Sequence, residues 1–306
     1  MLAALLCTFL FSISVTSGHR SARLIGGTEA NFWRLTCATL FLGCWSFAFG
    51  IGLDGVAFPL FLVSGMVGIG IGDGALFQAL PRLGSRLSLL LIQCLTAPFG
   101  ALIEWLWLGT TLRFVQICWG LTILLGVGIA LLPGKHSRHS RPELLAGTLL
   151  SILSALAGAF GAVLSRKAFA LAEAGGEPLG GVNAAFQRAV GGLLIGGLSL
   201  LLVKRREFRV QARAPGRLVT QVALAKWRGV WPWVLINGFA GQTLGVSCMQ
   251  AALQTTPTGV VLAIIALTPI VVMPLAFVLE GERPSAHSMI GGALAVAGAV
   301  GLASSR

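Results

Sequence analysis

Charged side chains are scarce in this sequence. The 306 residues include 10 Asp and Glu against 22 Lys and Arg, so only 10% of the chain is charged. Soluble domains carry about 25% charged residues, which argues against a single water-soluble domain. Disorder is excluded as well, because a chain with 56% hydrophobic residues would not stay solvated. The class that remains is a multi-pass membrane protein.

Recognisable catalytic and metal-binding patterns are missing too. The six cysteines show no Cys-x-x-Cys spacing, and the four histidines lie in loops or at a helix edge, which disfavours a zinc site or a disulfide framework. We find no Ser/His/Asp set and no paired carboxylates within one apolar run. We therefore predict that the protein is not an enzyme and has no catalytic residues, no metal and no cofactor.

Long apolar runs dominate the chain instead. Each is about as long as a helix needs to cross the ~30 Å hydrocarbon core. Helix is favoured over strand because backbone groups in lipid must pair within their own segment. The first run lacks the positive start of a signal peptide, so we interpret it as a retained helix. Ten spans are predicted, at about residues 1–18, 32–53, 56–80, 87–109, 114–133, 144–165, 182–203, 229–253, 258–280 and 285–305.

The two halves of the chain resemble each other. Gly27–Arg34 matches Gly181–Arg188 at four of eight positions, 154 residues apart. Pro59–Leu80 and Pro232–Leu253 share a proline, three glycines and Ala-Leu at a constant offset of 173 residues. Three matches in the same order, the third being a proline in the fourth span of each half, indicate an internal duplication.

An odd number of spans in each repeat has a geometric consequence. The second half then enters the membrane from the opposite side, so the halves form an inverted repeat. We predict an all-α fold of ten transmembrane helices in two inverted five-helix repeats, at residues 1–134 and 142–306. Such repeats are typical of secondary transporters, whose substrate site lies near the bilayer midplane between the halves.

Several motifs also carry a resemblance to a known family. They are Gly70-Ile71-Gly72-Asp73 followed by Ala79-Leu80, Pro98 ahead of Glu104–Gly109, Phe186-Gln187-Arg188, and Pro269-Ile270 followed by Leu279–Pro284. In these motifs the chain resembles an EamA-type member of the drug/metabolite transporter superfamily. The first half departs from the pattern, with Gly109-Thr110 where Gly-Glu is usual.

The resemblance implies a ten-helix carrier in the cell membrane for a small metabolite or drug-like solute. We expect alternating access, with export as the direction and proton coupling as a candidate energy source. The alternative is a membrane-embedded enzyme or a sensor without transport activity. The expected partners are the small-molecule substrate and the lipid bilayer, but not nucleic acid, and the protein is predicted to be a monomer or homodimer.

Asp73 is the carboxylate predicted to lie deepest in the membrane. It stands eight residues before Pro81, about 12 Å along a helix, and a charge at that depth costs ~2.5 kcal/mol or more. It is either a proton or cation-substrate site, or a packing hydrogen bonder that is protonated or paired with Gln78 or Gln93. The other candidates for substrate binding or proton coupling are Glu104, Gln93, Gln242, Arg34 and Arg188.

Arg34 and Arg188 lie one to two turns inside their predicted spans. Either they extend to the lipid headgroups, or one of them neutralises an anionic substrate. As equivalents in inverted repeats they would approach from opposite faces and act at two gates, and Arg188 has Glu173 or Glu177 as a candidate partner. Pro98, Pro269 and Pro274 are predicted helix breaks that kink their spans, either for gating or as static features of packing.

The loop charges predict an orientation. Of the 22 Lys and Arg, 17 fall on one side and 5 on the other. The positive-inside rule places the larger group in the cytoplasm and both termini outside. The family resemblance implies both termini inside, so the two arguments disagree.

Overall fold

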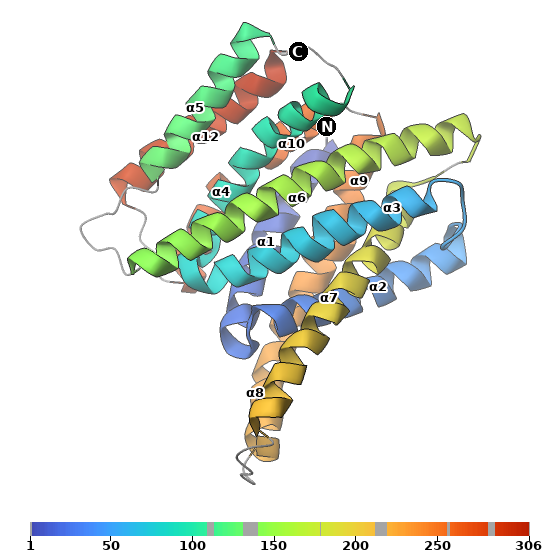
Figure 1. Cartoon of the computed structure of the whole chain (residues 1–306), viewed down its shortest axis with the longest axis vertical. Coiled ribbons are helices and arrows are strands. Elements are labelled where there is room, and N and C mark those ends of the chain that lie inside the picture. Colours follow the sequence, from blue (N-terminus) through green and yellow to red (C-terminus); the bar gives the residue numbers. More distant parts are fainter. Residues whose placement is uncertain are drawn as a thin grey trace.

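The protein folds as a bundle of helices, with no strand among the residues that its computed structural model describes, 2–108, 113–130, 140–177, 179–211, 219–255, 258–280 and 285–305 (Figure 1). The elements in chain order are α1 Leu2–Ile25, α2 Gly27–Phe49, α3 Phe58–Gly65, η1 Met66–Asp73, α4 Gly74–Leu108, α5 Phe114–Ala130, α6 Arg141–Ala174, α7 Gly181–Gln211, α8 Val219–Ile236, η2 Asn237–Gly245, α9 Val246–Thr255, α10 Thr258–Ile265, α11 Thr268–Glu280 and α12 Ala286–Ser304. The all-helical prediction is confirmed.

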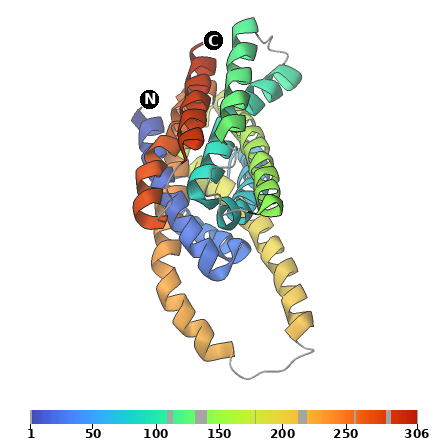
Figure 2. The same cartoon turned by 90° about the vertical axis from the view of Figure 1, so that its left-hand side faces the viewer.

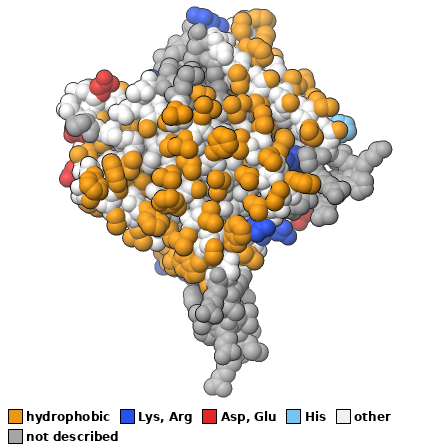
Figure 3. Space-filling view, turned by 180° about the vertical axis from the view of Figure 1, so that it is seen from behind, with side chains coloured by type: hydrophobic (Ala, Val, Ile, Leu, Met, Phe, Trp, Pro, Cys, Tyr) orange, Lys and Arg blue, Asp and Glu red, His pale blue; other side chains and the backbone are white. Residues whose placement is uncertain are grey.

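The helices are suited to a bilayer. Within the described residues, five are long and apolar enough to span one, and three shorter ones are also apolar. Large apolar side chains cover much of the surface (Figure 3), including Leu2, Phe49 and Val278, each more than three-quarters exposed. Soluble monomeric proteins rarely expose so extensive an apolar surface to water. Each of the ten predicted runs falls on one helix or on adjoining helices, while the number of membrane crossings stays a prediction.

One stretch is too long for a single span. Phe58–Trp107 covers 50 residues, about 75 Å of helix against a ~30 Å core. Gly84 divides it, with φ 78° and ψ 169°. Only glycine adopts this conformation without strain, so the chain can turn back here and pass from the third predicted span to the fourth.

Helices of each half pack against helices of the other half. α3 and η1 of the first half pack on α6 and α7, while η2 of the second half packs on α1 and α2. Gly65 and Gly238 are equivalent in the repeat. A Cβ on Gly65 would lie 1.9 Å from the backbone oxygen of Arg188, and one on Gly238 would lie 2.9 Å from that of Arg34. The duplication is therefore visible in the packing as well as in the sequence.

Two π-helical segments occupy matching places in the repeat. A shift of 173 residues carries η1 onto residues 239–246, which η2 overlaps almost completely. π-Helices are rare and frequently mark functional sites, because the wider turn leaves the backbone ladder irregular. These segments were not predicted from the sequence.

The prolines differ between the halves. Ala266 and Leu267 form a turn that separates α10 from α11, and Pro269 stands in the first turn of α11. Pro274 lies inside α11, whereas α4 continues through Pro98. The sequence predicted a break in both halves, and the described structure has one only at the second.

α7 and α8 extend together beyond the rest of the bundle (Figure 2). α5 and α12 pair at one side of it (Figure 1), where glycines allow backbones to meet. A Cβ on Gly291 would lie 2.4 Å from the amide nitrogen of Ala130. Close approach of this kind is typical of small residues between membrane helices.

Candidate functional site

A cavity of about 150 Å³ lies between the two halves of the chain. Helices α1, α2, η1 and α4 of the first half line it, together with α6, α7, η2, α9 and α10 of the second. Its walls are mostly apolar. The polar and charged lining residues are Ser14, Arg34, Asp73, Gln93, Thr96, Ser154, Arg188, Asn237 and Gln242.

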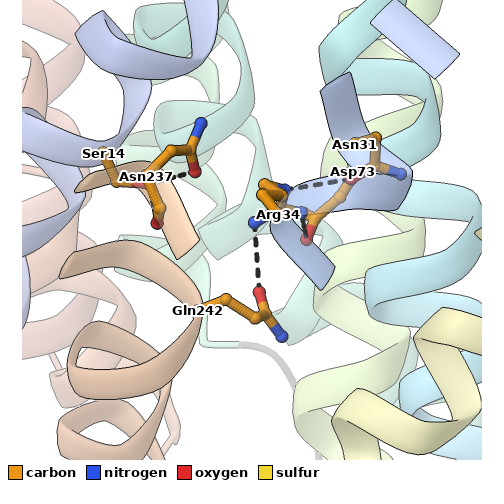
Figure 4. A network of polar contacts seen from close by, with 6 residues as sticks. All are labelled: Ser14, Asn31, Arg34, Asp73, Asn237 and Gln242. Carbon is orange, nitrogen blue, oxygen red and sulfur yellow. Dashed lines mark hydrogen bonds and ion pairs between the residues drawn. The ribbon is translucent and has the colours of Figure 1, made fainter. Parts of the chain in front are cut away.

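Arg34 is the centre of the polar network in this cavity (Figure 4). The residue is 4% exposed, and its Nη2 donates to Oδ2 of Asp73 at 2.5 Å, which makes an ion pair. Its Nε donates to Oδ1 of Asn31 at 3.0 Å, and its Nη1 to Oε1 of Gln242 at 3.2 Å. The guanidinium also lies over the Phe77 ring, 4.7 Å from its centroid.

This network joins the two halves. Asn31, Arg34 and Asp73 come from the first half, whereas Gln242 belongs to η2 of the second. Ser14 makes a second link, because its Oγ donates to Oδ1 of Asn237 at 3.0 Å. Hydrogen bonds to charged groups contribute more than neutral ones, roughly 1.5–3 kcal/mol each. The network therefore favours one relative placement of η2 against α1 and α2.

Asp73 does not have the partners that were expected. It binds Arg34, while the Gln78 side chain instead donates to Oγ1 of Thr28 at 2.8 Å. Gln93 lines the same cavity and is half-buried. The interpretation of Asp73 as a hydrogen bonder to Gln78 or Gln93 is thus replaced by a part-buried ion pair with Arg34.

Arg188 also differs from its expected setting. It is 3% exposed, so it does not extend to the headgroups, and Glu177 accepts from the Val56 amide instead of pairing with it. Glu173 makes no ion pair with it either. Arg34 and Arg188 line one common cavity, and their action at two gates stays a prediction.

The remaining predicted residues are placed as follows. Glu104 lies in α4, but its side chain is outside the described part of the structure. Pro98, Pro269 and Pro274 are not among the residues that line the cavity. Sequence analysis missed Ser14, Asn31 and Asn237, because serine and asparagine in an apolar run have no spacing rule that marks them as site residues.

Comparisons with known proteins support the same picture. The model of the EamA-like transporter family matches residues 1–132 and again 145–304. A solved structure described as "Crystal structure of protein" is 18% identical, with a TM-score of 0.60, covering 98% of this chain and 95% of its own. At that identity the likeness supports the fold alone. The comparison with curated proteins gave no match.

The two family matches fit the internal repeat found in the sequence and in the packing, and together they cover nearly the whole chain. Members of this family are membrane transporters. The chain therefore belongs to the EamA-like transporter family.

Proposed function

We propose that the protein is a secondary transporter that moves a small solute by alternating access through the cavity between its halves. The observation that carries this proposal is that equivalent elements of the two repeats converge on one cavity. In the first half these elements are α2 and η1, and their equivalents in the second half are α7 and η2. Two similar halves that share a site can exchange an inward-open and an outward-open arrangement. An enzyme or sensor has no evident need for that symmetry.

The matched π-helices are suited to this movement. η1 ends at Asp73, and η2 carries Asn237 and Gln242, so both segments supply cavity residues. Irregular backbone at membrane depth is tolerated where it faces protein or a cavity. We propose that η1 and η2 rearrange during the change of access, together with the turn that precedes Pro269.

Proton coupling is assigned to the pair of Asp73 and Arg34. The Asp73 side chain is 25% exposed, and it lines the cavity. Protonation would convert the carboxylate into a neutral group and release Arg34, which also holds Gln242 of the other half. A proton at Asp73 would thereby loosen the contact between the halves and couple the pH gradient to the change of access.

Flux measured in proteoliposomes tests both claims. The purified protein is reconstituted with a panel of small acids, amines and neutral solutes under an imposed pH gradient. Transport of at least one solute above empty vesicles supports the carrier, and none from any class contradicts it. The variant Asp73→Asn should retain solute exchange but lose gradient-driven accumulation. Asp54→Asn, which changes an exposed carboxylate in the same half, serves as the matched control.

Unchanged accumulation by Asp73→Asn would remove Asp73 from the coupling step.

We further propose export across the cell membrane, with the termini outside as the loop charges predict. Labelling of a cysteine placed at Ala286, in the first turn of α12, separates the two orientations. With ten crossings, an outer C-terminus puts that position on the cytoplasmic side, so labelling by an impermeant reagent added to whole cells would contradict this orientation.

A further inference from the structure

Arg188 is a buried cation with no hydrogen-bond acceptor among the residues that the structure describes. Neither its Nε nor its Nη1 has a hydrogen-bond partner within the described part of the chain, although the residue is 3% exposed and lines the cavity. Gln242 adds a third such donor, because its Oε1 already accepts from Arg34 and its Nε2 has no partner. Buried donors left unsatisfied are costly, above all on a charged group at membrane depth.

Comparison with Arg34 shows why Arg188 has no partner. Arg34 is held by three polar side chains, Asn31, Asp73 and Gln242. The offsets of the repeat, 154 residues for α2 and 173 for η1 and η2, give the matching residue for each of them. All three matches are apolar: Ala185, Val246 and Ile69.

The fourth neighbour of Arg34 does not change this conclusion. The Phe77 ring beneath Arg34 is matched by Gln250, which is buried but not among the residues that line the cavity. Neither amide atom of Gln250 makes a hydrogen bond, so Gln250 gives Arg188 no acceptor. The second half has the matching arginine but not the polar residues that satisfy Arg34 in the first half.

The charges of the cavity point the same way. Among the described residues that line it, only Arg34, Arg188 and Asp73 are charged, which leaves one net positive charge. Asp73 interacts with Arg188 through space, but its hydrogen bond is made to Arg34. An anion that reaches the cavity would therefore find one uncompensated guanidinium and an amide donor.

We propose that Arg188 binds the carboxylate of the transported solute, with Nε2 of Gln242 as the second donor, and that the solute is a small monocarboxylate with an apolar body. A guanidinium matches a carboxylate with two parallel hydrogen bonds. Apolar residues, including Leu80, Leu89, Ile92, Leu262 and Ile265, line the cavity for the rest of the molecule. An apolar cavity of about 150 Å³ holds a molecule the size of benzene, so benzoate is a suitable probe. This assignment rests on the proposed carrier function.

Calorimetric titration of the purified wild-type protein in detergent gives the first test. Benzoate, benzyl alcohol and benzylamine share one ring and differ in charge. Benzoate should bind at least about tenfold more tightly than either of the others, as expected for a charge-assisted hydrogen bond. Equal binding of all three, or preference for the amine, would overturn the proposal. Sodium chloride is titrated in parallel, and chloride that binds as tightly as benzoate would show an inorganic-anion site only.

Val246→Asp provides the sharper test. It places a carboxylate at the position that matches Asp73, on the cavity wall, and should give Arg188 an internal partner. We expect benzoate binding to weaken on the order of tenfold or more, while Val246→Asn of similar size keeps most of it. Equal affinities in these two variants would count against Arg188 as the anion ligand.

Removal of the arginine completes the series. Arg188→Gln should lose benzoate binding, whereas Arg166→Gln, which changes an exposed arginine on α6, should not. If Arg188→Gln fails to fold, the wild-type series and the Val246 pair still decide the matter. Transport of amines or neutral solutes but not benzoate would overturn this inference and leave the carrier function standing. Benzoate binding without flux of any solute would support the site and contradict the carrier.

Discussion

Arg34 and Arg188 occupy matching positions in the two halves, and both are buried in one cavity. Arg34 has an acceptor for each of its three hydrogen-bonding nitrogens. Arg188 has none for Nε or Nη1. The same residue type in the same repeat position is thus a structural cation in one half and an unsatisfied one in the other.

The two halves share their backbone contacts but differ in the polar side chains around the matching arginines. The backbone contacts remain paired, with Gly65 against Arg188 and Gly238 against Arg34, as the proposed exchange between two arrangements of the halves would require. The polar side chains are under no such constraint. A site between symmetric halves can therefore carry an asymmetric charge, and an asymmetric solute needs only one arginine to hold its charged end.

Asp73→Val, which gives the first half the residue of the second, should have the largest effect on stability. It leaves Arg34 buried without its ionic partner, and breaking a buried pair from one side costs about 3–5 kcal/mol. The measurement is unfolding of the purified protein in detergent. Arg34→Met combined with Asp73→Val should recover much of the loss, because no unpaired charge remains. An Asp73→Val variant as stable as the wild type would show that the Arg34–Asp73 ion pair contributes little to the free energy of unfolding.

Substitution of alanine for Gly65 or Gly238 should have the next largest effect on stability. The two losses should show which of the two close contacts is tighter. A Cβ at Gly65 would meet the Arg188 carbonyl at 1.9 Å, and one at Gly238 would meet the Arg34 carbonyl at 2.9 Å. Overpacking costs typically 1–3 kcal/mol, so Gly65→Ala should lose more stability than Gly238→Ala. Gly74 has no atom within 4 Å of an added Cβ, and Gly74→Ala is the control, expected to be neutral or slightly stabilising. The reverse order of the two glycines would contradict the packing of α3 on α7.

Much of this fold follows from the sequence, because membrane helices have a simple physical signature. The apolar runs and the repeat could both be read from hydropathy and spacing. The spacing rules also placed Arg34 and Arg188 at matching positions. They could not show that both arginines line one cavity, since that depends on the exchanged packing of η1 on α7 and of η2 on α2.

The partners of the charged residues were not predictable in the same way. The ion pair of Arg34 with Asp73 joins positions 39 residues apart, and the bond to Gln242 joins positions 208 apart. No local periodicity relates such residues. The π-helices were missed for a related reason, because an added residue in one turn depends on tertiary packing more than on local propensity.

The smallest expected effect concerns Asn31, the neutral partner of Arg34. Its Oδ1 accepts from Nε within the same helix, so it orients the arginine without joining the halves. Asn31→Ala should cost about 1 kcal/mol of unfolding free energy, well below Asp73→Val. Ala185→Asn makes the matching change beside Arg188. It should offer that guanidinium an acceptor and weaken benzoate binding less than Val246→Asp does, because an amide carries no charge. Unfolding in detergent and benzoate titration of the two variants check both effects. If Asn31→Ala destabilised the protein as much as Asp73→Val, Arg34 would depend on its orientation rather than its ionic partner, and the contrast with Arg188 would need a different cause.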